Sequence, residues 1–165
     1  CLHIQHVGVL ELQGMKSFNQ YITEVLDKPL KWKEFTKQPT AREASFDVGD
    51  FGYVIRVLIP KNAPNMMKTI GVEFTLGSEG GVSKGQGQKH DILKTGNAGV
   101  VFATVIDYIK HVVKDEKAER ILFSGKEQSR RSLYNAILKR MKKMGIIKRF
   151  ENNGDSFDAY VEKVK

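Results

Sequence analysis

The spacing of apolar side chains divides the chain into helical and extended segments. Apolar residues recur every three to four positions between Phe18 and Leu26, which predicts a helix that Pro29 ends. Residues 30–41 are polar and mixed and predict no regular element. β-branched and aromatic residues then concentrate in three segments, which predict a β meander. Its strands are expected at Ala44–Val48, Tyr53–Ile59 and Thr69–Leu76.

The second half of the chain predicts two helices, one strand and a closing hairpin. The run Asn97–Lys114 is long and apolar on nearly all sides, which favours a buried helix, although its β-branched residues leave a pair of strands open. Residues 128–144 are apolar along one face and are followed by Gly145, a typical end of a helix. The strands are expected at Arg120–Ser124, Ile146–Phe150 and Phe157–Val164, the last two joined by a turn at 152–155.

These elements predict an α+β fold in which a mixed β-sheet is flanked by helices. Residues 77–89 contain five glycines and show no hydrophobic periodicity, so we expect a loop there. The main domain is expected to span residues 41–165. Residues 1–40 are expected to form an N-terminal arm and helix, and the sequence leaves open whether they belong to the same fold.

Composition excludes several classes of protein. Hydrophobic residues make up 41% and charged residues 28% of the 165 residues, as in folded domains and unlike disordered chains. No run approaches the ~18 uninterrupted apolar residues that a membrane-spanning helix needs. The lone cysteine, Cys1, cannot form an internal disulfide, which suits a reducing compartment. No signal peptide is recognisable, so we expect the chain in the cytoplasm or, as a piece of a larger phage protein, in a virion.

From Ala44 onward, the predicted order of elements resembles the GNAT (N-acetyltransferase) superfamily. In that family a β meander leads through a phosphate-binding turn into a long helix, and a strand, a second helix and closing strands follow. Residues 93–98, LKTGNA, are similar to the family's phosphate-binding turn at Gly96 and Ala98. They depart from it at Leu93, where the family has Arg or Gln.

A second motif lies in the later helix. Ser132-Leu133-Tyr134 is similar to the "LY" part of the family's later motif, and Gly145-Ile146 is similar to its "GF" part after a longer gap. The resemblance implies an enzyme that transfers the acetyl group of acetyl-CoA to an amine without a metal ion. It also implies that the strand Thr69–Leu76 is splayed away from its partner strand Arg120–Ser124. The acetyl-CoA contacts that it implies are Phe74 and Thr75 for the pantetheine arm, Lys94, Gly96, Asn97, Ala98 and Gly99 for the pyrophosphate, and Arg130 or Arg131 for the 3′-phosphate.

The chemistry of residues 94–99 agrees with a phosphate site. Free backbone N–H groups at a helix N-terminus bind anions, and the residues from Asn97 onward would supply the first of them. Gly96 permits close approach of the backbone, and Lys94 adds a positive charge. The alternative is that this segment only caps a buried helix.

Two residues are candidates for acid–base catalysis. Glu73 interrupts an apolar strand and so points to the opposite face from its neighbours. The resemblance implies that a carboxylate on this strand could accept a proton from an attacking amine, directly or through water. Tyr134 falls at the position of the family's frequent general acid, and a phenol with a pKa near ~10 can donate a proton at neutral pH. The alternatives are a solvent-facing Glu73 in a half-exposed sheet and a Tyr134 packed in the core.

The positive charge of the chain concentrates in residues 126–149. This segment contains one acidic residue, Glu127, and its net charge of +8 equals that of the whole chain. Its nine basic residues are Lys126, Arg130, Arg131, Lys139, Arg140, Lys142, Lys143, Lys148 and Arg149. The segment could bind nucleic acid or an acidic protein, or it could be a solvated helix face. A second hypothesis for function is therefore a non-catalytic accessory module of a larger phage protein that binds such a partner through this segment.

Histidine spacing gives no indication of a metal site. None of the four histidines, His3, His6, His90 and His111, is spaced with acidic residues or cysteine as metal ligands are, so no metal is expected. Asp107 and His111 lie one helical turn apart, a spacing more typical of a surface hydrogen bond than of a catalytic pair.

Overall fold

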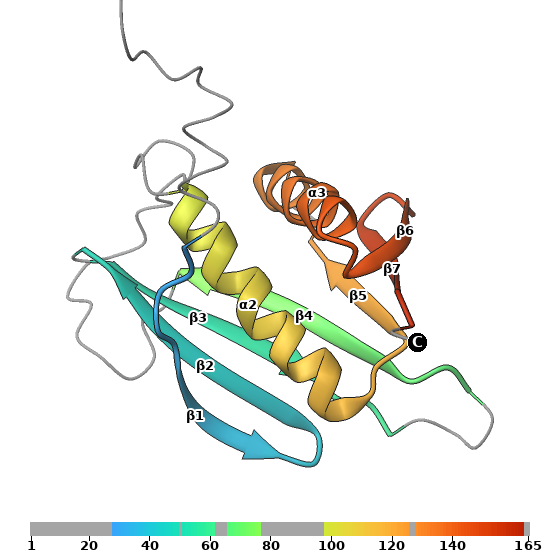
Figure 1. The fold of residues 1–165 in the computed structure, drawn as a ribbon, viewed down its shortest axis with the longest axis horizontal. Helices are drawn as coiled ribbons and strands as arrows, with labels where there is room; N and C mark the ends of the chain where they lie inside the picture. The colour runs from blue at the N-terminus through green and yellow to red at the C-terminus, as the bar shows by residue number, and fades with distance from the viewer. Residues whose placement is uncertain (1–27, 50, 62–65, 77–97, 126–127, 164–165) are drawn as a thin grey trace, which may run out of the picture.

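The computed structural model describes residues 28–49, 51–61, 66–76, 98–125 and 128–163, and Figure 1 shows them as a β-sheet with two helices. In these residues the sheet has seven strands in the order β1-β2-β3-β4-β5-β7-β6. The elements are β1 (Lys33–Gln38), β2 (Ala41–Val48), β3 (Phe51–Leu58), β4 (Thr69–Leu76), α2 (Ala98–Glu116), β5 (Arg120–Ser124), α3 (Gln128–Lys143), β6 (Ile147–Asn152) and β7 (Ser156–Val161).

Most of the predicted elements are confirmed. β4 and β5 have the predicted bounds, the meander is present, and both helices form where the pattern placed them. Residues 98–116 are helical, so the alternative of two strands there is wrong. Gly145 and Gly154 have φ of 73° and 85° and occupy the predicted helix end and hairpin turn. The expected helix at 18–26, the loop at 77–89 and the turn at 93–97 lie outside the described residues.

Strand β1 was not predicted, because it lacks the alternation of a half-buried strand. It is an edge strand on which no residue is fully buried, and polar side chains fill most of its positions. It pairs antiparallel with β2, so residues 33–38 belong to the same sheet as the rest of the chain. A register shift between Glu34 and Thr36 marks a bulge in this edge strand, as edge strands often carry.

The strand pairing has one parallel pair, which lies at the centre of the sheet. β1 to β4 form an antiparallel meander, β4 pairs parallel with β5, and β7 pairs antiparallel with both β5 and β6. Both helices therefore connect parallel strands, α2 from β4 to β5 and α3 from β5 to β6. Since such crossovers are right-handed and both proceed in the same direction across the sheet, both helices are expected on one face.

Burial along the strands confirms this one-sided arrangement. In β4, Ile70, Val72 and Phe74 are buried, whereas Thr69, Gly71 and Glu73 between them are not. The same alternation in β2, β3, β5 and β7 forms one apolar face, and α2 and α3 pack on it. α2 contributes buried side chains around much of its circumference, from Val101 to Val113, as its apolar composition predicted. No helix of the described residues covers the other face of the sheet, which we call the open face.

A buried arginine joins the edge of the sheet to α2. The side chain of Arg42, on β2, has no exposed surface. Its guanidinium lies 2.7 Å from the carboxylate of Glu34 on β1, 3.1 Å from Asp115 and 3.2 Å from Glu116, both on α2. The hydroxyl of Tyr108 donates a second hydrogen bond of 3.0 Å to the Glu34 carboxylate. Because burying a charge costs free energy unless it is paired, this set of contacts fixes β1 and α2 relative to each other.

The predicted hydrogen bond between Asp107 and His111 is replaced by contacts with other elements. Asp107 accepts a hydrogen bond of 2.9 Å from the indole N–H of Trp32. His111 Nε2 lies 3.2 Å from the Arg42 guanidinium and 3.4 Å from Asp115. Both residues therefore help to hold the segment before β1 against α2.

The Arg42 contacts make stability depend on pH. Burial works to raise the pKa of Glu34, but hydrogen bonds from Arg42 and Tyr108 and the charge of Arg42 outweigh it and lower the pKa. Desolvation likewise opposes a lowered pKa at Asp115, and the Arg42 hydrogen bond and the charge of His111 prevail. A carboxyl group whose pKa is lower in the folded chain stabilises the fold above its unfolded pKa, and this contribution is lost as the pH falls through the folded pKa.

Replacing Arg42 with Met should lower the free energy of unfolding by about 2–4 kcal/mol at neutral pH, because Glu34 and Asp115 lose their counter-charge. The difference from wild type should shrink as the pH falls from about 5 to about 3, where the carboxyl groups become protonated. Denaturant unfolding across this range measures both effects. Arg56→Met is the matched control, since Arg56 pairs with Glu43 on the open face and its loss should cost less than about 1 kcal/mol. Equal losses in the two variants would contradict this account.

Candidate active site

The parallel strands β4 and β5 are paired over only part of their length. Their register runs from Thr69↔Arg120 to Val72↔Phe123 and ends there. β4 continues to Leu76 with β3 as its partner, while β5 keeps its pairing with β7 up to Ser124. Figure 1 shows β5 running away from β4 toward the C-terminal ends of both strands. The pairing of the two strands therefore ends at Val72 and Phe123, one residue before β5 itself ends at Ser124.

Tyr134 of α3 lies at this divergence. The backbone N–H of Phe74, which lies beyond the last β4–β5 pair, donates a long hydrogen bond of 3.4 Å to the Tyr134 hydroxyl. The Tyr134 ring is buried and packs against Phe123 of β5 with ring centroids 5.2 Å apart. The ring of Phe74 stacks on the ring of Tyr53 of β3, with ring centroids 5.7 Å apart. A phenol hydroxyl thus stands beside the backbone of β4 where a neighbouring strand would otherwise pair.

Glu73 and Tyr134 approach the divergence from opposite faces of the sheet. Glu73 is exposed on the open face, as its position in the apolar strand predicted, and Tyr134 packs on the helix-covered face. The Glu73 carboxylate and the Arg130 guanidinium are both close enough to Tyr134 to influence its ionisation. Of the predicted site residues, the structure places Arg130 and Tyr134 one turn apart on α3, and Glu73 on the other face of β4.

Tyr134 is held in its protonated form. Burial is the main cause that raises the pKa of its phenol, and the negative charge of Glu73 adds to it. The Phe74 N–H and the positive charge of Arg130 act in the opposite direction without reversing the shift. The hydroxyl consequently keeps its proton at neutral pH and above, as a general acid requires. Core packing and an acid role are compatible for this residue, since its ring is buried and its hydroxyl faces the backbone of β4.

The turn from β5 into α3 approaches Tyr134 closely. Gly125 follows β5 directly, and a Cβ atom there would lie 3.0 Å from both the Arg130 Cβ and the Tyr134 Cε2. The Gly125 N–H donates a hydrogen bond of 2.9 Å to the Asp155 carbonyl in the β6–β7 turn, which fixes the position of this turn. Sequence reasoning missed Gly125. A glycine between a strand and a helix was the available signal, but it does not reveal which ring lies against it.

The remaining predicted contacts of acetyl-CoA are placed only in part. Phe74 faces the covered side of the sheet, and the backbone of Thr75 pairs with Val54 of β3. Ala98 and Gly99 open α2 and are half-buried. The predicted residues Lys94, Gly96 and Asn97 lie outside the described residues.

The N-terminus of α2 lies toward the diverging end of β4. At the opposite end of the helix, the ammonium group of Lys68, just before β4, donates a hydrogen bond of 3.3 Å to the Glu116 carbonyl. α2 thus runs antiparallel to β4, and its first turn is directed to the end where β4 and β5 separate. Free N–H groups of a helix N-terminus and the carboxyl ends of parallel strands are the usual location of anionic ligands in folds with crossover helices.

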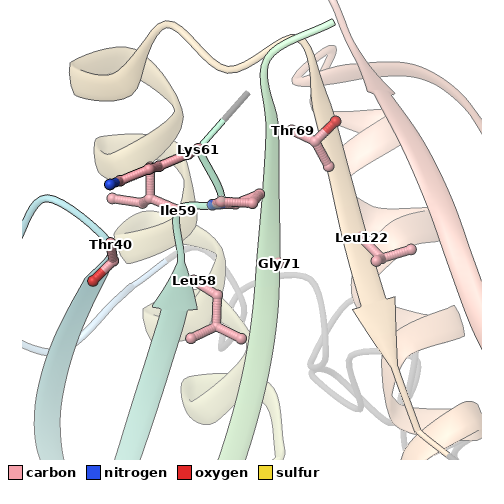
Figure 2. A pocket seen from close by; sticks show the side chains of 8 residues that line it. Thr40, Leu58, Ile59, Lys61, Thr69, Gly71 and Leu122 are labelled. Carbon is pink, nitrogen blue, oxygen red and sulfur yellow. The ribbon is translucent and has the colours of Figure 1, made fainter. Parts of the chain in front are cut away.

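An apolar groove of about 380 Å³ lies on the open face, beside the first residues of β4. Figure 2 shows Gly71 between Leu58 of β3 and Leu122 of β5. Because glycine has no side chain, space is left between the two leucines. The groove is lined by Thr40, Leu58, Ile59, Pro60, Lys61, Thr69, Gly71 and Leu122. It includes none of the predicted site residues and no acidic group. Its lining offers no acid–base pair, and we do not assign the active site to it.

Comparison with known proteins does not identify a family: no family model matches the chain, and no curated protein matches it. Among the described residues, no group of His, Cys, Asp and Glu side chains could hold a metal ion. Neither α2 nor α3 is long and apolar enough to cross a membrane.

Replacing Gly125 with Ala should destabilise the fold by about 1–3 kcal/mol, because the new methyl group meets the Tyr134 ring and the Arg130 Cβ at 3.0 Å. The near-ultraviolet circular dichroism of the aromatic residues should change with it. Gly71→Ala is the matched control: its Cβ would lie 3.6 Å from Leu58, an ordinary contact, and the change should cost less than about 1 kcal/mol. If Gly125→Ala is as stable as Gly71→Ala, the close packing of Tyr134 at this turn is wrong.

Proposed function

We propose that this chain binds acetyl-CoA where β4 and β5 diverge and transfers the acetyl group to an amine. The observation that carries the proposal is the placement of a carboxylate and a protonated phenol on opposite faces of the sheet at this divergence. Beside the phenol, the N–H of Phe74 donates a long hydrogen bond of 3.4 Å to the Tyr134 hydroxyl. An acid, a base and a backbone N–H donor are groups that acyl transfer uses.

The architecture supports the resemblance to the GNAT superfamily. A β meander is followed by a long helix, a parallel partner strand, a second helix and two closing strands, in the order that the resemblance implies. The separation of β4 from β5 beyond Val72 agrees with the implied splayed pair. We therefore propose a GNAT-like fold for residues 41–165, with residues 33–38 adding an edge strand.

The residues present fit acetyl-CoA at this place. Beyond Val72, β4 offers backbone groups on the side facing away from β3, which suit the amide groups of a pantetheine arm. Arg130, in the first turn of α3, offers a guanidinium close to Tyr134 for a phosphate of the same ligand. Ala98 and Gly99 at the start of α2 would contribute free amides to the pyrophosphate.

Acetyl-CoA supplies a thioester, whose acyl carbon forms a bond to the amine nitrogen as its bond to sulfur breaks. Tyr134 would donate its phenolic proton to the departing thiolate. Glu73 would accept the proton that the amine nitrogen loses, directly or through water. Because Glu73 stands on the open face and Tyr134 on the covered face, the amine would approach from the open side of the sheet. Positioning of the two reactants supplies the rest of the rate enhancement.

Titration calorimetry with acetyl-CoA should show micromolar binding to the purified chain. Tyr134→Phe should bind acetyl-CoA within about threefold of wild type but reduce kcat by about 10²-fold or more, because the acid is lost and the ring is kept. Release of free thiol in the presence of a mixture of amino acids, polyamines and lysine peptides measures the rate. Ser132→Ala, an exposed change on the same helix, is the control and should leave both values unchanged.

Two outcomes would overturn the proposal. Absence of acetyl-CoA binding at millimolar ligand would exclude the site altogether. Full activity of Tyr134→Phe together with full activity of Glu73→Gln would exclude these residues from the chemistry and leave at most a binding role.

A further inference from the structure

The outer side of α3 is a surface of uniform positive charge. We call Arg131, Lys139, Arg140, Lys142 and Lys143 the α3 basic surface. α3 contains no acidic residue from Gln128 to Lys143. The three lysines are exposed, and the two arginines are half-buried. Leu133, Tyr134, Ile137, Leu138 and Met141 are buried, and the two arginines border this buried side of the helix. The three lysines face solvent along about 6 Å of the last turns of α3.

Three arginines of the sheet, by contrast, are each paired with a carboxylate. Arg42, Arg56 and Arg120 each lie within 3.1 Å of a carboxylate. Within the described part of the chain, no carboxylate lies at ion-pair distance from Arg131, Lys139, Lys142 or Lys143. Like charges one turn apart, such as Lys139 and Lys143, destabilise an isolated helix slightly. The fold thus gains no ion pair from these four charges.

The helix dipole explains only one end of the surface. Lys142 and Lys143, in the last turn, lie where a helix favours positive charge. Arg131 lies in the first turn, which has no acidic residue, and there the dipole disfavours a positive charge. The dipole therefore accounts for Lys142 and Lys143 but not for Arg131, whose charge a partner outside the fold would stabilise.

The composition of the surface favours nucleic acid over a protein partner. Interfaces between proteins carry aromatic and apolar side chains at their centre. On α3, the exposed positions whose side chains the structure describes are Arg130, Ser132, Lys139, Lys142 and Lys143, none of them apolar. The buried ring of Tyr134 cannot serve as a platform for stacked bases, which single-stranded partners require. A row of basic side chains without apolar or aromatic contacts matches a phosphate backbone.

We infer that the α3 basic surface binds the phosphate backbone of double-stranded nucleic acid without reading its sequence. The binding depends on Lys139, Lys142 and Lys143 as point charges and on Arg131 at the other end of the helix. It does not require acetyl transfer, because its three lysines are exposed on the side of α3 that faces away from the buried Tyr134. Phosphate neutralisation releases counterions, so the affinity falls steeply with salt.

Fluorescence anisotropy with a labelled 20-base-pair DNA duplex of arbitrary sequence tests the inference, at salt concentrations from about 50 to about 200 mM. The triple variant Lys139→Gln/Lys142→Gln/Lys143→Gln should bind at least about tenfold more weakly than wild type at 100 mM salt. The slope of log affinity against log salt should become shallower by about 2–3. The matched control is Lys33→Gln/Lys110→Gln/Lys114→Gln, which removes the same charge from exposed positions on β1 and α2. It should stay within about threefold of wild type.

Three results would overturn the inference. Equal losses in the two triple variants would mean that net charge alone attracts the duplex. Tighter binding of a labelled single strand, or of polyglutamate, would mean that the surface serves another class of partner. No binding of the duplex at 50 mM salt would exclude a nucleic-acid surface. The two variants change only exposed lysines, and matching thermal unfolding curves would show that both are folded.

Discussion

The arrangement of this molecule depends on where the pairing of β4 with β5 stops. Four residue pairs join the two strands, and beyond Val72 the strand that pairs with β4 in the described part of the chain is β3. A buried backbone N–H needs an acceptor, and α3 supplies one in the hydroxyl of Tyr134. The close turn at Gly125 in turn allows α3 to begin against this ring. The end of this pairing thereby places a phenol beside the backbone of β4, with the Glu73 carboxylate on the other face of the strand.

The one-sided packing of the sheet has a second consequence. α2 and α3 cover one face, and the contacts of the buried Arg42 hold α2 to the edge strands β1 and β2. The open face carries Glu73 and the apolar groove beside Gly71. An acceptor amine would therefore approach from the open face, and its nitrogen would meet the acyl carbon that carries the departing sulfur where the pairing of β4 with β5 ends. The lysines of the α3 basic surface lie on neither face of the sheet but on the outer side of α3. A nucleic acid bound there and an acetyl acceptor at the open face would therefore not compete for the same site.

The sequence predicted the elements whose periodicity is strong. The bounds of β4 and β5 follow from short apolar runs, and the two helices follow from their faces. β1 could not be predicted, because an edge strand whose polar side chains contact Arg42 and α2 shows no alternation. Strand alternation placed Glu73 correctly on the open face, and the resemblance made Tyr134 a candidate; the catalytic roles of both stay predictions. Gly125 and the Arg42 contacts were not identified, because they depend on which segments the topology brings together, and local spacing contains no information on that.

The amide group of Phe74 tests the central claim most directly. Nuclear magnetic resonance of the ¹⁵N-labelled chain can follow it during titration with acetyl-CoA. The account predicts large shifts at residues 73–76 of β4 and at Ser124 and Gly125, with none in the β1–β2 hairpin. It also predicts that the Phe74 amide exchanges with solvent more slowly once acetyl-CoA is bound. Shifts confined to the open-face groove or to the α3 basic surface, or no shifts at millimolar ligand, would contradict a cofactor site between β4 and β5.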